Sequence, residues 1–217
     1  MLDDFFKNLP PAQVLAVDGK YVPIDLSADN ELIAELKTSK DFEDYIGEFL
    51  RQKKAVVAFG GYNERRNLYR RSDIFNDEES VRDIHIGIDL WAEAETAVLA
   101  PIDGIVHSFD FNTGLGNYGP TIILEHNISN TSFYTLYGHL SVESIEDIEI
   151  GDKIAAGEEF AALGDASVNG DYAPHLHFQI IIDIEDNFGD YPGVCSQSDL
   201  DHYLKNCPDP NLLLKLK

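Results

Sequence analysis

The chain has 217 residues, 44% hydrophobic residues and a net charge of −23, which is typical of a folded globular protein with room for one large domain. Because phosphate binding requires clustered Lys and Arg side chains, this charge argues against nucleic acid and anionic membranes as partners. The N-terminus has no basic stretch followed by an apolar one, and no apolar run approaches the ~20 residues of a membrane span. We therefore expect a cytoplasmic protein whose two cysteines, Cys195 and Cys207, are free thiols.

The first ~55 residues are predicted to be largely helical. A buried helical stripe recurs from residue 40 onward at Phe42, Tyr45, Ile46, Phe49 and Leu50. Thr38 or Ser39 is the expected N-cap of this helix, and a shorter helix is predicted over Glu31–Lys37. The run AVVAF before Gly60 predicts a strand that ends in a turn. Residues 1–79 are thus predicted to form a helical or mixed N-terminal extension.

Basic residues are concentrated before residue 83. The segment Arg51–Arg82 holds half of the sixteen Lys and Arg residues, and none occurs from Asp83 to Asp152. One interpretation is local charge balance in an acidic protein. The other is a rim that binds a substrate carboxylate or phosphate. Either Arg65 and Arg66 or Arg70 and Arg71 could reach the groove, and Arg70 and Arg71 are the candidate substrate-binding residues.

From Ile84 onward the sequence consists of short β-branched segments separated by turn signals, with weak helical periodicity. This pattern predicts a mainly β fold, an antiparallel β-sandwich or barrel-like domain over residues 80–190. Residues 191–217 are predicted to be a C-terminal tail with a short helix near Ser198–Lys205 and an extended end.

Two histidines one residue apart occur in the run APHLHFQI. In a strand, His175 and His177 would project to one face, while Leu176 and Phe178 would pack on the other. On this evidence alone they could equally be core or surface histidines. His85 and Asp89 are four residues apart in IHIGIDL, a segment that must bend, and Gly87 permits bending.

One histidine of the HxH pair together with His85 and Asp89 gives a set of two histidines and one aspartate, which suits zinc with a fourth position open. Which of the two binds the ion stays open at this point. The other histidine, and His139 in YTLYGHLS, could take a proton from water or stabilise an oxyanion. His107, His126 and His202 lack such context and are interpreted as structural or surface residues.

Glycine-rich loops near 112–118 and 165–172 are expected to wall a groove around these groups. Asn117 and Tyr118 are candidate substrate-binding residues in the first loop, although a plain hairpin turn explains GLGNYG equally well.

Several motifs together resemble, in order, the lysostaphin/LytM-type zinc metallopeptidases of metallopeptidase family twenty-three. They are HIGID, APIDGIV, GLGNYG, IILEH, YTLYGHLS, GDKIAAGEEFAALGD and PHLHFQI, within residues 80–183. The resemblance implies a small all-β catalytic domain built on a duplicated hybrid motif. It implies one zinc ion per chain held by His85, Asp89 and His177, and catalytic roles for His139 and His175. Members typically cleave peptide bonds in peptidoglycan cross-links; Gln179 departs from the Glu that is common at its position.

The segments GGYNERRNLYRRSDIF and CPDPNLLL are similar to a subgroup in which this domain is fused to aminotransferase and kinase-like modules in large cytoplasmic proteins. That likeness favours a small amino-acyl or amide substrate. The predicted function is a zinc-dependent hydrolase of peptide or amide bonds. The alternatives are a non-catalytic metal-binding or regulatory module, and a biotinyl or lipoyl carrier, which the absence of lysine from 83–152 disfavours. The sequence gives no indication of the oligomeric state.

Overall fold

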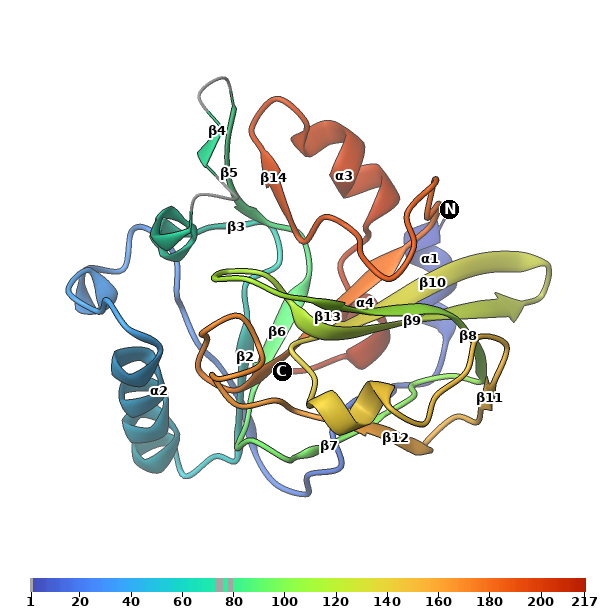
Figure 1. Ribbon diagram of the computed structural model, residues 1–217, viewed down its shortest axis with the longest axis horizontal. Coiled ribbons are helices and arrows are strands. Elements are labelled where there is room, and N and C mark those ends of the chain that lie inside the picture. The colour runs from blue at the N-terminus through green and yellow to red at the C-terminus, as the bar shows by residue number, and fades with distance from the viewer. Residues whose placement is uncertain (1, 73–75, 78–79) are drawn as a thin grey trace.

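A computed structural model describes residues 2–72, 76–77 and 80–217. Its main element is an eight-stranded sheet in which only the β1–β2 pair is parallel and the other pairs are antiparallel (Figure 1). In spatial order the strands are β1 (Tyr21–Pro23), β2 (Val57–Gly60), β6 (Ile88–Trp91), β13 (His175–Ile181), β10 (Thr131–Gly138), β9 (Gly119–Ile128), β8 (Gly104–Asn112) and β11 (Lys153–Ile154).

The remaining strands form smaller sheets. They are β12 (Glu159–Ala162) with β7 (Ala97–Leu99), and β14 (Val194–Ser196), β5 (Ser80–His85) and β3 (Glu64–Arg65), with β4 (Asn76–Asp77) also pairing with β5. The helices are α1 (Leu2–Asn8), α2 (Ser39–Lys53), α3 (Leu200–Asn206) and α4 (Asn211–Leu214), and the 3-10 helices are η1 (Glu31–Ile33), η2 (Asn67–Arg71) and η4 (Val142–Ile145). The predicted mainly β, largely antiparallel fold with helix in its N-terminal part is confirmed.

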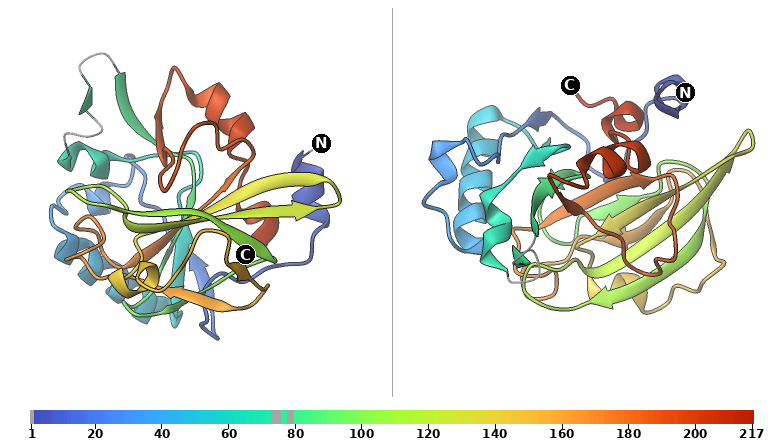
Figure 2. Two further views of the ribbon diagram at one scale, coloured as in Figure 1. Left: turned by 45° about the vertical axis from the view of Figure 1, so that its right-hand side comes forward. Right: turned by 90° about the horizontal axis from the view of Figure 1, so that it is seen from above.

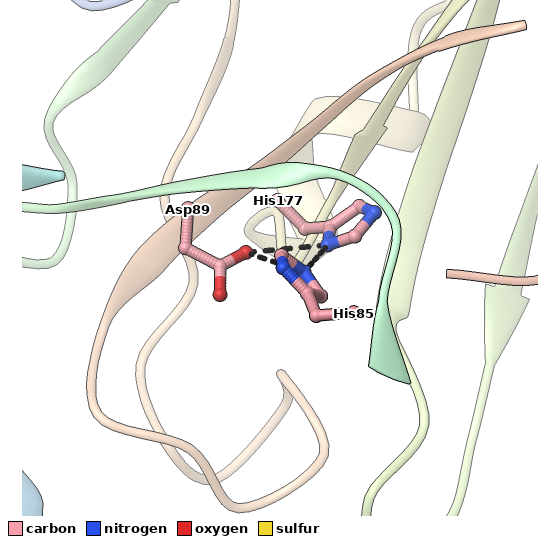
Figure 3. Close-up of side chains that lie close together, drawn as sticks. All are labelled: His85, Asp89 and His177. Atoms are coloured by element: carbon pink, nitrogen blue, oxygen red, sulfur yellow. Dashed lines mark hydrogen bonds and ion pairs between the residues drawn. The ribbon is translucent and has the colours of Figure 1, made fainter. Parts of the chain in front are cut away.

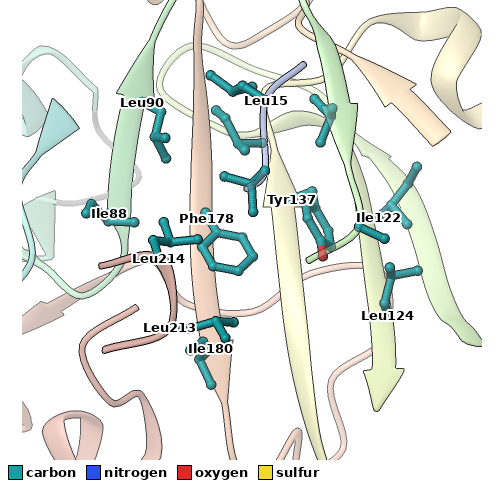
Figure 4. Close-up of a cluster of buried hydrophobic side chains, with 14 of the residues drawn as sticks. Leu15, Ile88, Leu90, Ile122, Leu124, Tyr137, Phe178, Ile180, Leu213 and Leu214 are labelled. Carbon is teal, nitrogen blue, oxygen red and sulfur yellow. The ribbon is translucent and has the colours of Figure 1, made fainter. Parts of the chain in front are cut away.

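The main sheet separates an apolar core from a polar site. On β13, Leu176, Phe178 and Ile180 are fully buried in the core, where they meet apolar side chains of β6, β9 and β10 (Figure 4). The alternate residues His175, His177 and Gln179 are also buried, but they face the other side. This is the alternation predicted from APHLHFQI, and it fixes the direction of both histidines by the burial of their neighbours.

The N-terminal part mixes helix and strand. The amphipathic stripe is confirmed as α2, with Thr38 as its N-cap. The Thr38 hydroxyl accepts a hydrogen bond from the Asp41 backbone N–H, and the Asp41 carboxylate accepts one from the Thr38 backbone N–H. The wider prediction of helix across the first residues is wrong for β1, which pairs in parallel with β2. The helix predicted over Glu31–Lys37 is only the single 3-10 turn η1, none of whose residues is fully buried, and so short a segment gains little from helix formation.

The C-terminal tail contains the predicted helix, α3, but its last residues are not extended. They form α4, whose Leu213 and Leu214 are buried in the core (Figure 4). Helix α1 packs against α4, and Lys215 Nζ donates to the Lys7 carbonyl at 3.0 Å, so both ends of the chain lie on one side of the molecule (Figure 2). Among the described residues, no helix is both long and apolar enough to cross a membrane, and the cytoplasmic location stays a prediction.

Candidate metal centre

His85, Asp89 and His177 come together where the chain turns from β5 into β6. His85 is the last residue of β5, and Asp89 lies in β6 opposite His177 of β13. The bend falls at residues 86–87, and a Cβ on Gly87 would lie 2.5 Å from His177 Cε1. Gly87 is therefore needed for the close approach of His177.

The three side chains present three donor atoms to one point (Figure 3). His85 Nε2 lies 2.9 Å from His177 Nδ1, and Asp89 Oδ1 lies 3.2 Å from each of these nitrogens. Ligands at zinc distances in a tetrahedron are about 3.3–3.5 Å apart. The three separations are a few tenths of an ångström shorter than these, so the donor atoms lie close to three corners of such a tetrahedron.

Hydrogen bonds on the far side of each ring determine which nitrogen carries the proton. His85 Nδ1–H donates to the Gly61 carbonyl at 2.8 Å, and His177 Nε2–H donates to Gln179 Oε1 at 2.9 Å. The Gln179 amide is itself oriented, because its Nε2 donates to the Pro192 carbonyl at 3.1 Å. The two facing nitrogens then direct their lone pairs at each other and at the carboxylate oxygen. A cation bound between these atoms removes the electrostatic repulsion among them.

Burial favours the neutral form of the His85 ring, whereas neighbouring groups keep the Asp89 carboxylate ionised. Burial lowers the pKa of His85 to about 4, although the nearby Asp89 works in the opposite direction. Burial alone would raise the pKa of Asp89, but His85 and Arg66 hold it well below its ordinary value. An anionic carboxylate beside neutral imidazoles is the ligand set that zinc requires.

His139 and His175 lie next to this centre with their ring centroids 4.2 Å apart. Each Nδ1–H donates to a backbone carbonyl at 2.8 Å, that of Asn169 for His139 and that of Ala173 for His175. Each Nε2 therefore keeps its lone pair, and burial lowers the pKa of both rings. His139 has a backbone φ of +65°, a costly conformation that positions its ring at this point.

All five groups line one cavity of about 310 Å³. Gly116, Asn117, Tyr118 and Tyr172 also line it, where the two glycine-rich loops were predicted to form its wall. Tyr118 Oη lies 3.4 Å from His177 Nε2, whereas the Asn117 amide bonds within its own loop, donating to the Thr113 carbonyl. The side chains of Arg70 and Arg71 lie outside what the structure describes.

The other histidines lie away from this cavity. His126 is buried between the Asp103 carbonyl and Thr135, His107 contacts Ser108, and His202 lies 3.3 Å from Glu185. None of the three lines the cavity.

Comparison with known proteins gives the family. The family model described as peptidase family M23 matches residues 83–187. Over this stretch the chain belongs to the M23 peptidase family. The stretch includes the five cavity residues His85, Asp89, His139, His175 and His177. The likeness to a subgroup of fused cytoplasmic proteins stays a prediction.

Three similar proteins illustrate the M23 match. An uncharacterized metalloprotease of Haemophilus influenzae is 30% identical over 98 residues, 45% of this chain and 18% of that protein, so this chain spans less than a fifth of that relative. The catalytic domain of the antimicrobial peptidase lysostaphin from Staphylococcus simulans is 25% identical, with 61% of this chain and 80% of that chain covered and a TM-score of 0.44. A zinc-containing peptidase from Vibrio cholerae is 26% identical, with 43% and 26% covered and a TM-score of 0.34.

One residue of the centre was not singled out from the sequence. The Arg66 side chain is only 2% exposed, and its Nη1 donates to Asp89 Oδ2 at 2.5 Å. Its neighbour Arg65 is 53% exposed and pairs with Asp83 at the surface. The basic cluster was the only sequence signal, and it does not separate these adjacent arginines. Arg66 also lies before the stretch that matches the M23 family.

Proposed function

We propose that the protein is a zinc-dependent hydrolase of peptide or amide bonds, with one zinc ion held by His85, Asp89 and His177. The observation that carries this proposal is the arrangement of lone pairs in the cavity. Four imidazoles have their outer N–H groups bonded to protein acceptors, so that their inner nitrogens and Asp89 Oδ1 are all free of protons on the cavity side.

A zinc ion at such a site supplies a water of lowered pKa and polarises the carbonyl of the scissile bond. His139 and His175 carry the proton chemistry. Because both are neutral, with Nε2 as the basic atom, either can accept the proton from the attacking water. The imidazolium formed is stabilised by its Nδ1–H bond to a backbone carbonyl and returns the proton to the leaving amine.

The size of the cavity supports a small substrate. It is walled on one side by Leu26, Phe42 and Tyr69, which precede the M23 domain, and on another by the segment 187–194. A cavity of about 310 Å³ is at the small end of ligand pockets and suits a small peptide or amide compound.

Tyr118, with its hydroxyl near His177, is the proposed donor to the substrate carbonyl oxygen, and Asn117 shapes the rim. Arg70 and Arg71 stay predicted substrate-binding residues.

Metal content and hydrolysis, measured on the same preparations, test this proposal. Wild type, His177→Ala, His139→Gln and the exposed control His202→Ala would be freed of metal, reloaded with zinc and assayed against short peptides and amino-acyl amides. We expect about one zinc per chain in all but His177→Ala. Hydrolysis should be retained in His202→Ala and fall at least about 100-fold in His139→Gln, which is the lower end of the range for a proton-transfer group.

Two results would contradict it. Absence of stoichiometric zinc in the wild type would remove the metal centre. Stoichiometric zinc with no hydrolysis of any peptide or amide would instead favour the alternative, a non-catalytic metal-binding module.

A further inference from the structure

The carboxylate of Asp89 has its two oxygens in different environments. Oδ1 faces the two imidazole nitrogens, whereas Oδ2 accepts from Arg66 Nη1 at 2.5 Å. Charge-assisted bonds of this kind are among the strongest hydrogen bonds in proteins. Oδ2 is thereby directed away from the point where the three donor atoms converge.

The guanidinium of Arg66 is itself held on several sides. Its Nε donates to Glu64 at 2.7 Å, and its central carbon lies 5.5 Å from the centre of the Trp91 ring. The side chain is 2% exposed, and its Nη2 is a buried donor without a hydrogen-bond partner among the described residues. An unsatisfied buried N–H destabilises the folded state, so this ion pair is not one optimised for stability alone.

We propose that Arg66 is a positioning residue of the metal centre: by occupying Oδ2 of Asp89, it leaves a single carboxylate oxygen for the metal and keeps the fourth coordination position open. This inference rests on the zinc site proposed above. Rotation of the carboxylate to offer both oxygens would break the bond to Arg66 and leave a buried guanidinium charge without that partner, which is strongly destabilising.

The positive charge has a second consequence. Arg66 offsets part of the negative charge of Asp89, because its own positive charge is shared between Asp89 and Glu64. An ion beside such a partly compensated carboxylate retains more of its own charge for polarising a substrate carbonyl than an ion beside an uncompensated carboxylate.

Replacing zinc with cobalt(II) makes the coordination visible, because four-coordinate cobalt absorbs visible light several times more strongly than five- or six-coordinate cobalt. The variants are Arg66→Met, which removes the donor, Arg66→Lys, which keeps a charged donor, and Arg65→Met as matched control. Arg65 is the adjacent residue and carries the same charge, but it pairs with Asp83 and does not contact Asp89.

We expect strong four-coordinate bands in wild type and Arg65→Met, a several-fold loss of intensity in Arg66→Met as Oδ2 joins the metal, and recovery in Arg66→Lys. Equal spectra in wild type and Arg66→Met would overturn the proposal and leave the zinc site intact. Equal losses in Arg66→Met and Arg65→Met would also overturn it, because charge alone would then be the cause. If the wild type binds no cobalt, the zinc site and this proposal fall together.

A measurement on the wild type guards against misfolding of Arg66→Met. A crystal structure of the zinc-loaded wild-type protein should place only Oδ1 of Asp89 within bonding distance of zinc, with Oδ2 still bonded to Arg66. Two carboxylate oxygens on the ion would overturn the proposal without any variant.

Discussion

At the scale of single residues, the centre is organised by acceptors behind the histidines. Gly61, Asn169 and Ala173 provide backbone carbonyls, and Gln179 provides an amide oxygen. An imidazole that donates to such an acceptor is fixed in both tautomer and orientation. Gln179 accepts the outer N–H of His177, a role that a carboxylate commonly has behind a metal-binding histidine, and it adds no negative charge.

Gln179 gives a direct test of this role. Gln179→Leu keeps the side chain's bulk but removes the acceptor, so His177 can place a proton on Nδ1, and we expect zinc affinity to fall about 10–100-fold. Gln179→Glu keeps an acceptor and should retain tight binding. Competition with a chromophoric chelator measures both, with Gln197→Leu, a change at the surface, as control. Unchanged affinity in Gln179→Leu would show that His177 is oriented by packing alone.

His139 predicts an acid sensitivity of the metal-free protein. Its pKa is held well below 6.5 by burial and then by the neighbouring histidines, so the folded state binds fewer protons than the unfolded state. The resulting stability is present above about pH 6.5 and is lost as pH falls toward the folded-state pKa. We expect the free energy of unfolding of the wild type, minus that of His139→Gln, to decrease by about 1.4 kcal/mol for each pH unit between pH 6 and 4.5. Urea unfolding of both proteins measures this difference. Parallel pH curves for the two proteins would contradict a neutral buried His139.

The sequence was sufficient to predict that these five polar residues meet in one cavity, because the M23 motifs cover them and strand alternation orients His175 and His177. The metal-binding and catalytic roles assigned to them stay predictions. The sequence was not sufficient for Arg66. Its role depends on the long-range contact between the segment that contains β3 and η2 and the start of β6, and no local pattern encodes that contact.

At the scale of elements, the helices and strands that their own sequence stabilises were predictable. Short elements that form only against a neighbouring part of the fold were not. Helix α2 has a stripe and a capping box, and β13 has an apolar face. Strand β1 has only three residues and exists because β2 lies beside it. Helix α4 has only four residues and forms where Leu213 and Leu214 reach the core. Such elements are set by tertiary contacts rather than by propensity.

The cap of α2 can be tested alone. Thr38→Ala removes the side-chain oxygen that accepts from the Asp41 backbone N–H, and we expect a loss of about 1 kcal/mol in the free energy of unfolding. Thr113→Ala, at an exposed loop position, should change it by less than about 0.5 kcal/mol. Chemical denaturation of both variants checks the difference, and equal values would mean that packing of Phe42 and Ile46 determines where the helix starts.

At the scale of the whole molecule, the segment before the M23 domain is part of the metal centre. Strand β2 pairs with β6, the Gly61 carbonyl fixes His85, and Arg66 holds Asp89. The division into residues 1–79 and 80–190 stays a prediction, but these contacts indicate that the first part does not act as a removable unit.

A shortened chain tests this dependence. A protein starting at residue 80 retains the whole M23 match, yet it lacks β2, the carbonyl behind His85 and the guanidinium on Asp89. We expect it to unfold at lower temperature and to hold much less than one zinc per chain, as measured by circular dichroism and elemental analysis against the full chain. A stable fragment with stoichiometric zinc would show that the M23 domain completes its centre unaided.

The packing of α1 against α4 has a consequence for how this protein can be engineered. The Ala12 backbone N–H donates to the Leu213 carbonyl, and Lys215 Nζ donates to the Lys7 carbonyl, so the two ends of the chain lie side by side. A short linker would therefore join them without crossing the molecule. The chain could then be opened at Ser129 and Asn130, an exposed two-residue turn between β9 and β10 with both φ angles positive. Such a circular permutant would keep every strand pairing of the fold while moving both termini from the α1–α4 pair to the tip of the β9–β10 hairpin.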